Sequence, residues 1–89
     1  MEGRHGRAVE DAQDSGVAET IGTLTYIERR VLLALSEGLS RREIASHLRV
    51  SPRTVGLALT VGKEKLGAQS ITAAAVIVRI HELLLRRGH

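Results

Sequence analysis

The fold is decided by residues 37–55, which read EGLSRREIASHLRVSPRTV. Ser40 and Glu43 form a capping box, in which each side chain satisfies an unpaired backbone amide at a helix start. Ser51 followed by Pro52 marks a second helix start, because serine is a good N-cap and proline suits the first helical position. Few residues remain between these two helices, so they meet across a tight turn. The stretch therefore predicts a helix-turn-helix.

Another helix is predicted before this pair. Thr25 and Glu28 form a further capping box, and Gly38 is placed to end the helix in a left-handed C-terminal cap. The apolar residues of this helix recur at helical spacing and predict one buried face: Ile27, Val31, Leu32 and Leu35.

The helix that begins at Pro52 is predicted to end at Gly67. The residues expected to pack between it and the preceding short helix are Val55, Leu59 and Leu66, with Ile44, Ala45 and Leu48. At 100° per residue, its outward side carries Arg53, Thr54, Gly56, Leu57, Thr60, Val61, Glu64 and Lys65. Gly56 and Gly62 each weaken the helix by about 1 kcal/mol relative to Ala.

A last helix is predicted from Ser70 to about Arg87, closed by Gly88. Apolar residues cover roughly two thirds of its circumference, which is more than one core contact needs. The alternatives are burial inside its own domain or a second copy of the same helix, and the second is favoured because symmetric dimers are the commonest oligomers. The residues expected in a homodimer contact are Ile71, Ala74, Ala75, Val78 and Leu85.

Charge is unevenly distributed along the chain. Residues 1–23 contain two Arg against five Asp and Glu, whereas residues 24–89 contain eleven Lys and Arg against five Glu. A basic domain is expected of a protein that contacts phosphate. A solvated basic face without a ligand is the alternative.

The first 22 residues mix four glycines with scattered charges and show no sustained apolar period. We expect residues 1–22 to be a disordered N-terminal tail and residues 23–89 to form one folded domain. The tail is too short to hold a sensor domain. The chain is therefore expected either to act without an attached sensor or to be a domain excised from a longer protein.

Several function classes are excluded by composition. The chain has no Cys, one Tyr and no Phe or Trp, which excludes a thiol nucleophile and leaves few aromatic rings on which single-stranded RNA bases stack. No segment resembles a signal peptide or reaches the roughly 20 apolar residues of a membrane span. We therefore expect a cytoplasmic, nucleoid-associated protein that does not bind a membrane.

Catalysis is not expected either. His47 and His81 have no carboxylate or thiol partner at the spacing of a metal site or a triad, and His5 and His89 lie near the termini. No glycine-rich loop has the spacing of a nucleotide-binding motif. The sequence predicts neither a metal nor another cofactor.

Residues 24–55, LTYIERRVLLALSEGLSRREIASHLRVSPRTV, and residues 63–76, KEKLGAQSITAAAV, closely resemble the LuxR/GerE family. The blocks that keep the family spacing are Gly38-Leu39-Ser40, Glu43-Ile44-Ala45, Ser51, Thr54-Val55 and Lys65-Leu66-Gly67. Region four of sigma factors shares the first half of this pattern, but the second stretch favours the LuxR side. The resemblance implies an all-α, four-helix domain that binds DNA through its third helix and dimerises through its fourth.

The third helix departs from the family pattern. Gly56 stands where the family usually has Lys, Ala58 where it often has His, and Val61 where it often has Asn. Gly62 replaces a core Ile or Leu. The first three departures each remove a candidate DNA contact.

A sparse readout of double-stranded DNA is therefore expected. Arg53 is suited to guanine O6 and N7, and Leu57 and Val61 to thymine methyl groups. The basic and hydroxyl side chains nearby are suited to phosphates, which take most protein–DNA hydrogen bonds. The candidate DNA-binding residues are Arg41, Arg42, Ser51, Arg53, Thr54, Leu57, Thr60, Val61, Lys63 and Lys65.

Leu57 and Val61 also support a different hypothesis. Four residues apart on an outward side, they form an apolar patch of the kind that marks a protein interface. The chain would then be a divergent helix-turn-helix module that binds another regulator or RNA polymerase. Replacing Arg53 and Lys65 together with Ala would abolish DNA binding but spare such a partner.

Overall fold

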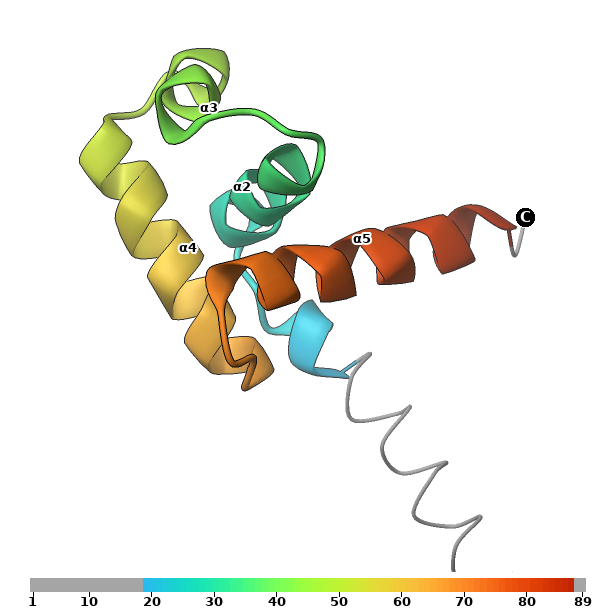
Figure 1. Ribbon diagram of the computed structural model, residues 1–89. Coiled ribbons are helices and arrows are strands. Elements are labelled where there is room, and N and C mark those ends of the chain that lie inside the picture. Colours follow the sequence, from blue (N-terminus) through green and yellow to red (C-terminus); the bar gives the residue numbers. More distant parts are fainter. Residues whose placement is uncertain (1–18, 88–89) are drawn as a thin grey trace, which may run out of the picture.

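The computed structural model describes residues 19–87 (Figure 1). Its helices with defined bounds are α2 (Tyr26–Ser36), α3 (Arg41–Leu48), α4 (Pro52–Leu66) and α5 (Ile71–Arg87). No strand occurs in this part of the chain. The predicted all-α fold with a helix-turn-helix is confirmed, and α3 and α4 are its two helices.

Two capping boxes begin α2 and α3, as predicted. Thr25 Oγ1 accepts a hydrogen bond from the Glu28 amide at 3.1 Å, and Glu28 Oε1 accepts one from the Thr25 amide at 2.9 Å. The corresponding distances for Ser40 and Glu43 are 3.1 and 2.8 Å. Donation by the Ser40 amide and hydroxyl holds the pKa of Glu43 below its ordinary value. The ionised form of Glu43 is therefore favoured in its capping box.

The start of α4 and the ends of α2 and α4 also follow the sequence signals. Ser51 caps α4 and Pro52 occupies its first turn. Gly38, after α2, and Gly67, after α4, have φ of 92° and 63°, in the left-handed region where glycine carries no Cβ penalty. Arg49 takes the same conformation at the end of α3, with φ 57° and ψ 45°. The turn between α3 and α4 thus contains a non-glycine residue in a conformation that favours glycine.

The core is aliphatic and is centred on α2, which contacts each of the other three helices (Figure 1). The fully buried core residues are Val31, Leu32, Ile44, Ala45, Val55, Leu59, Ala74, Ala75 and Val78. All four helices contribute to it. The predicted buried faces of α2, α3 and α4 are confirmed, with Ile27, Leu35, Leu48 and Leu66 partly buried against this core.

Gly62 is buried where α4 meets α2. A Cβ atom on residue 62 would lie 2.9 Å from Leu32 Cδ1, and Leu32 is itself fully buried. A larger side chain would therefore displace a core leucine. The end of the Leu32 side chain fills the space that a side chain at residue 62 would occupy.

The structure differs from the sequence prediction at residues 19–22. These residues were expected in the disordered tail, but they form a helical turn, and Ile21 is only 5% exposed. The amides of Thr23 and Leu24 donate to the carbonyls of Thr20 and Ile21 at 3.0 and 3.1 Å. Burial of Ile21 anchors the turn to the domain. The rest of the predicted tail and Gly88 lie outside the described residues.

Within residues 19–87, no single helix is long and apolar enough to span a membrane. The bent pair of α4 and α5, at 72° to each other, passes the same test by length and composition alone. Both helices of that pair contribute buried residues to the core described above.

Candidate nucleic-acid interface

The outward side of α4 is the candidate nucleic-acid interface. Val55, Leu59 and Gly62 face the core. The opposite side of the helix carries exposed residues, which are Arg53, Leu57, Thr60, Val61 and Glu64. A capped and exposed second helix after a tight turn is the element that helix-turn-helix proteins insert in the major groove.

The candidate residues of the sequence prediction lie mainly on α4 and at the start of α3. Arg41, Arg42, Ser51, Arg53, Thr54, Leu57, Thr60 and Val61 are exposed, and Lys63 is partly buried. Leu57 is 58% and Val61 36% exposed. These two apolar side chains therefore lie uncovered in the middle of the outward side.

Ser51 and Thr54 are paired at the start of α4. The Thr54 amide donates to Ser51 Oγ at 3.1 Å, and the two hydroxyl oxygens are 2.9 Å apart. The pair fixes the direction in which α4 leaves the turn. Its hydroxyl groups still face solvent.

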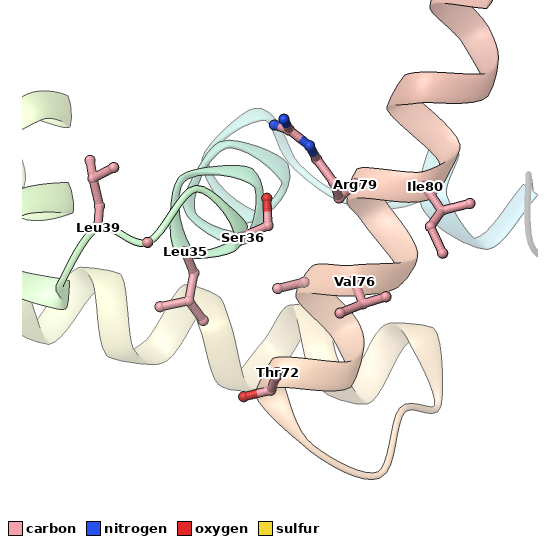
Figure 2. Close-up of a pocket in the computed structure, with 9 residues that line it drawn as sticks. Leu35, Ser36, Leu39, Thr72, Val76, Arg79 and Ile80 are labelled. Atoms are coloured by element: carbon pink, nitrogen blue, oxygen red, sulfur yellow. The ribbon is translucent and has the colours of Figure 1, made fainter.

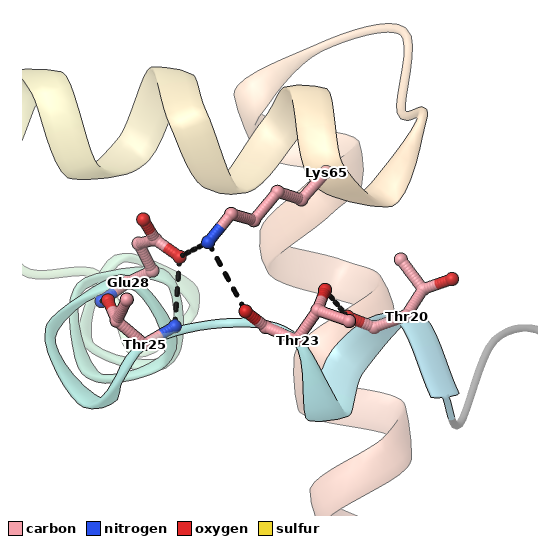
Figure 3. Close-up of polar contacts among 5 residues, drawn as sticks. All are labelled: Thr20, Thr23, Thr25, Glu28 and Lys65. Carbon is pink, nitrogen blue, oxygen red and sulfur yellow. Dashed lines mark hydrogen bonds and ion pairs between the residues drawn. The ribbon is translucent and has the colours of Figure 1, made fainter.

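Lys65 is not free on the outward side of α4. Its Nζ donates to Glu28 Oε1 at 2.8 Å and to the Thr23 carbonyl at 3.2 Å (Figure 3). Lys65 therefore ties the end of α4 to the start of α2. Lys65 therefore has a structural role, and its contact with phosphate stays a prediction.

The ionised form of Glu28 is held by its partners. Burial raises the pKa of this carboxyl, but the hydrogen bonds from Lys65 and the Thr25 amide, together with the charge of Lys65, lower it more. The pKa of Glu28 therefore lies below its ordinary value. The side chain is 11% exposed, against 33% for Lys65, so solvent screens this ion pair less than a surface pair.

The cations of α3 and α4 are otherwise unpaired. Among residues 19–87, the ion pairs are Lys65–Glu28 and Arg79–Glu37. The guanidinium groups of Arg41, Arg42 and Arg53 therefore have no carboxylate partner in this part of the chain. Unpaired cations on one helix-turn-helix provide a positive surface for phosphate groups.

Arg49 is an exposed basic residue that the sequence interpretation did not include among the candidate DNA-binding residues. It lies in the turn directly before α4. Its left-handed backbone conformation costs free energy relative to glycine. A signal was present in the sequence, because a basic residue stands where a helix C-cap favours Gly or Asn.

The predicted dimer residues on α5 need correction. Ala74, Ala75 and Val78 are 0–2% exposed and belong to the core of their own domain, and Ile71 packs against that core. A second copy cannot reach Ala74, Ala75 or Val78 in the folded domain, whereas Ile71 is only partly buried. Leu85, at 49% exposed, is the member of the predicted set that is open to solvent.

Most of the apolar residues that α5 exposes lie on a different side, and these are Val76, Ile80, Leu83 and Leu84, each between 43% and 61% exposed. Leu85 lies on the side of Ala74 and Val78. The C-terminal part of α5 extends beyond the other helices (Figure 1). Val76 and Ile80 also line a groove of about 470 Å³ between α5 and the end of α2, which includes Leu35, Leu39 and Thr72 (Figure 2).

No group of three or more His, Asp or Glu side chains among residues 19–87 is placed to hold a metal ion. His47 and His81 lie on different helices, α3 and α5. The described part of the chain thus brings together cations and apolar side chains rather than a set of metal ligands.

Two helices across a tight turn, with the second capped and exposed, define a helix-turn-helix domain. Residues 22–78, well over half of the chain, match the family described as bacterial regulatory proteins, luxR family. The chain belongs to this LuxR family. The matched segment ends within α5, so the exposed leucines at residues 83–85 lie beyond it.

Curated relatives share part of this domain. Proteins named as HTH-type transcriptional regulators from Mycobacterium bovis and from two strains of Mycobacterium tuberculosis are 53% identical to the chain over 49 residues. The similarity covers 55% of this chain and 6% of each relative. The chain therefore spans a small part of the length of these relatives. No solved structure matches the chain.

Proposed function

We propose that the protein is a transcription regulator that binds double-stranded DNA by inserting α4 in the major groove. The observation that carries this proposal is the exposed side of α4, flanked by the unpaired guanidinium groups of Arg41, Arg42 and Arg53. Membership of the LuxR family and the printed names of the mycobacterial relatives support it.

The contacts divide between bases and phosphates. Arg53, in the first turn of α4, is suited to donate to guanine O6 and N7, and Leu57 and Val61 to pack on thymine methyl groups. Arg42 of α3, with Thr54 and Lys63 on the borders of that side of α4, is suited to phosphate oxygens. Affinity then depends mainly on phosphates, while a small number of side chains sets the sequence preference.

Dimerisation through α5 is a second part of the proposal. The exposed apolar residues of α5 include Val76, Ile80, Leu83 and Leu84, which follow one another at helical spacing. A contiguous apolar surface of this kind is a protein contact rather than a solvated face. Two copies joined through it would place two α4 helices on half-sites separated by a whole number of helical turns.

The test is fluorescence anisotropy with a labelled mixed-sequence duplex, titrated at salt concentrations from about 50 to 200 mM. Binding should weaken linearly on a log–log plot, with a slope near −0.9 for each neutralised phosphate. Arg53→Ala should weaken binding, whereas Arg86→Ala, which removes the same charge from the last turn of α5, should have little effect. Absence of binding at the lowest salt would overturn the proposal.

The exposed pair of Leu57 and Val61 supports the alternative, in which the same side of α4 binds another regulator or RNA polymerase. The two functions differ in their response to Arg53→Ala. Loss of DNA binding with this variant favours the first. A protein partner that binds Arg53→Ala normally but not Leu57→Ala would favour the second.

A further inference from the structure

Gly56 leaves a gap on the side of α4 that faces α3. At 100° per residue, Gly56, Thr60 and Lys63 form one flank of the exposed side of the helix. Arg41 Nη1, from the first residue of α3, lies 3.9 Å from the position that a Cβ atom on residue 56 would take. The space beside Gly56 is otherwise open. A guanidinium group from one helix therefore lies over the missing side chain of the other.

The position of Arg41 is not explained by the stability of the fold. Its side chain is exposed and forms neither a hydrogen bond nor an ion pair with another residue among 19–87. Glu43, the nearest acidic residue on α3, is engaged by the Ser40 amide. A cation at the N-terminus of a helix is also disfavoured by the helix dipole. All the donors of the Arg41 guanidinium are therefore available to a ligand.

Resting on the DNA-binding function proposed above, we infer that Arg41 supplies to the middle of α4 the DNA contact that residue 56 cannot make. The recognition surface is then composite, and combines Arg41 of α3 with Arg53 and the apolar residues of α4. The guanidinium donates to acceptors on the DNA, which are guanine O6 and N7 or phosphate oxygens.

The experiment compares Arg41→Ala with Arg86→Ala, which loses the same charge on α5. In the anisotropy titration, Arg41→Ala should weaken binding by about 10-fold, the usual scale of a hydrogen bond to a charged group, and Arg86→Ala by less than about twofold. The melting temperature of Arg41→Ala should stay close to that of the wild type, because Arg41 has no partner in the domain.

A second variant tests whether residues 41 and 56 share one role. Gly56→Lys in the Arg41→Ala background should restore most of the lost affinity, because its Cβ enters open space and its ammonium lies in the same region. In the wild-type background, Gly56→Lys should increase DNA affinity much less, since the Arg41 guanidinium already occupies that region. Equal gains in both backgrounds would overturn the inference.

Two further measurements identify the DNA atoms that accept hydrogen bonds from Arg41, and either result supports the inference. If Arg41 contacts a phosphate, Arg41→Ala reduces the magnitude of the salt slope by about 0.9 on every duplex. A guanine contact leaves the slope unchanged, and replacement of guanine by 7-deazaguanine, which lacks N7, removes the effect of Arg41→Ala. If the wild type binds DNA but Arg41→Ala binds equally well, this inference fails while the proposed function stands. If the wild type binds no duplex, both fail.

Discussion

α4 and α5 are neighbours in the chain and contact each other, but they expose different chemistry. The exposed side of α4 combines Arg53 and Thr60 with Leu57 and Val61, whereas that of α5 carries the aliphatic residues Val76, Ile80, Leu83 and Leu84. Mixed polar surfaces suit the grooves of DNA, and uniformly apolar surfaces suit another protein surface. The comparison supports the proposal that two adjacent helices serve two kinds of partner.

The ion pairs of the two helices also differ, in how far they are exposed to solvent. Lys65 of α4 pairs with Glu28, whose side chain is 11% exposed, and the pair joins two capped helix ends. Arg79 of α5 pairs with Glu37 at 3.2 Å, with side chains 40% and 53% exposed. α4 is therefore fixed by a partly buried pair, whereas the pair of α5 is largely screened by water.

The largest expected effect comes from placing a carboxylate on each exposed side in turn. Leu84→Glu on α5 should weaken self-association by at least about 100-fold, because a charge would be buried in an apolar contact. Leu57→Glu on α4 should leave self-association unchanged and remove DNA binding through repulsion by phosphate. Sedimentation and anisotropy measure the two properties.

Both side chains are exposed in the single chain, so each variant should keep the helical content of the wild type by circular dichroism. A wild-type chain that stays monomeric at tens of micromolar would contradict the dimer proposal. A Leu57→Glu variant with normal DNA affinity would contradict the assignment of α4.

The second effect concerns the two ion pairs. Glu28→Gln retains a side chain able to form the capping box but loses the charge opposite Lys65, and should lower the free energy of unfolding by about 1–2 kcal/mol at pH 7. Glu37→Gln, the matched change in the exposed pair, should cost about 0–0.5 kcal/mol. Urea denaturation of both variants measures the difference.

The loss in Glu28→Gln should depend on pH in a defined direction. The pKa of Glu28 is lower in the folded protein than in the unfolded chain, so its stabilising contribution is complete above about pH 4.3 and is lost as pH falls through the folded-state pKa. The denaturation midpoints of the wild type and of Glu28→Gln should therefore converge as the pH is lowered below about 4. A constant gap between them would show that the ion pair contributes nothing.

The local signals of the sequence were sufficient to predict most of the fold. These signals are short-range patterns: two capping boxes, the Ser51-Pro52 helix start and the glycines that end helices. Each determines the structure of residues next to it in the chain. The core faces of α2 to α4 follow from helical periodicity in the same way. The turn at residues 19–22 was missed because its anchor, Ile21, is a single apolar residue without a repeating pattern.

The candidate site was less accessible to prediction, because its decisive contacts join distant residues. Lys65 meets Glu28 across 37 positions, and a helical wheel of α4 shows Lys65 only as an outward cation. The wheel of α5 likewise shows that its apolar arc is too wide but not which part the domain covers. Ala74 and Val78 were therefore assigned to a dimer although they are core residues.

A smaller effect separates the two glycines of α4. Gly56→Ala should raise the free energy of unfolding by about 0.5–1 kcal/mol, because the methyl group enters open space and Ala favours the helix. Gly62→Ala gains the same propensity but forces Leu32 aside, and should lower it by about 1 kcal/mol. Thermal unfolding of the two variants shows whether each change raises or lowers the free energy of unfolding. Stabilisation by both would mean that the core around Leu32 repacks easily.

The last effect concerns how α4 reads DNA. If Leu57 packs on thymine methyl groups, replacing thymine by uracil in a selected site should cost about 0.8 kcal/mol for each contacted methyl, the value for one buried CH₂ group. The same replacement should have no effect on Leu57→Ala, because the side chain that contacts the methyl is absent. Arg53→Ala is the control, since its loss of affinity should be the same on both duplexes. A wild type that binds thymine and uracil duplexes equally, with an undiminished salt slope, would restrict α4 to polar and phosphate contacts.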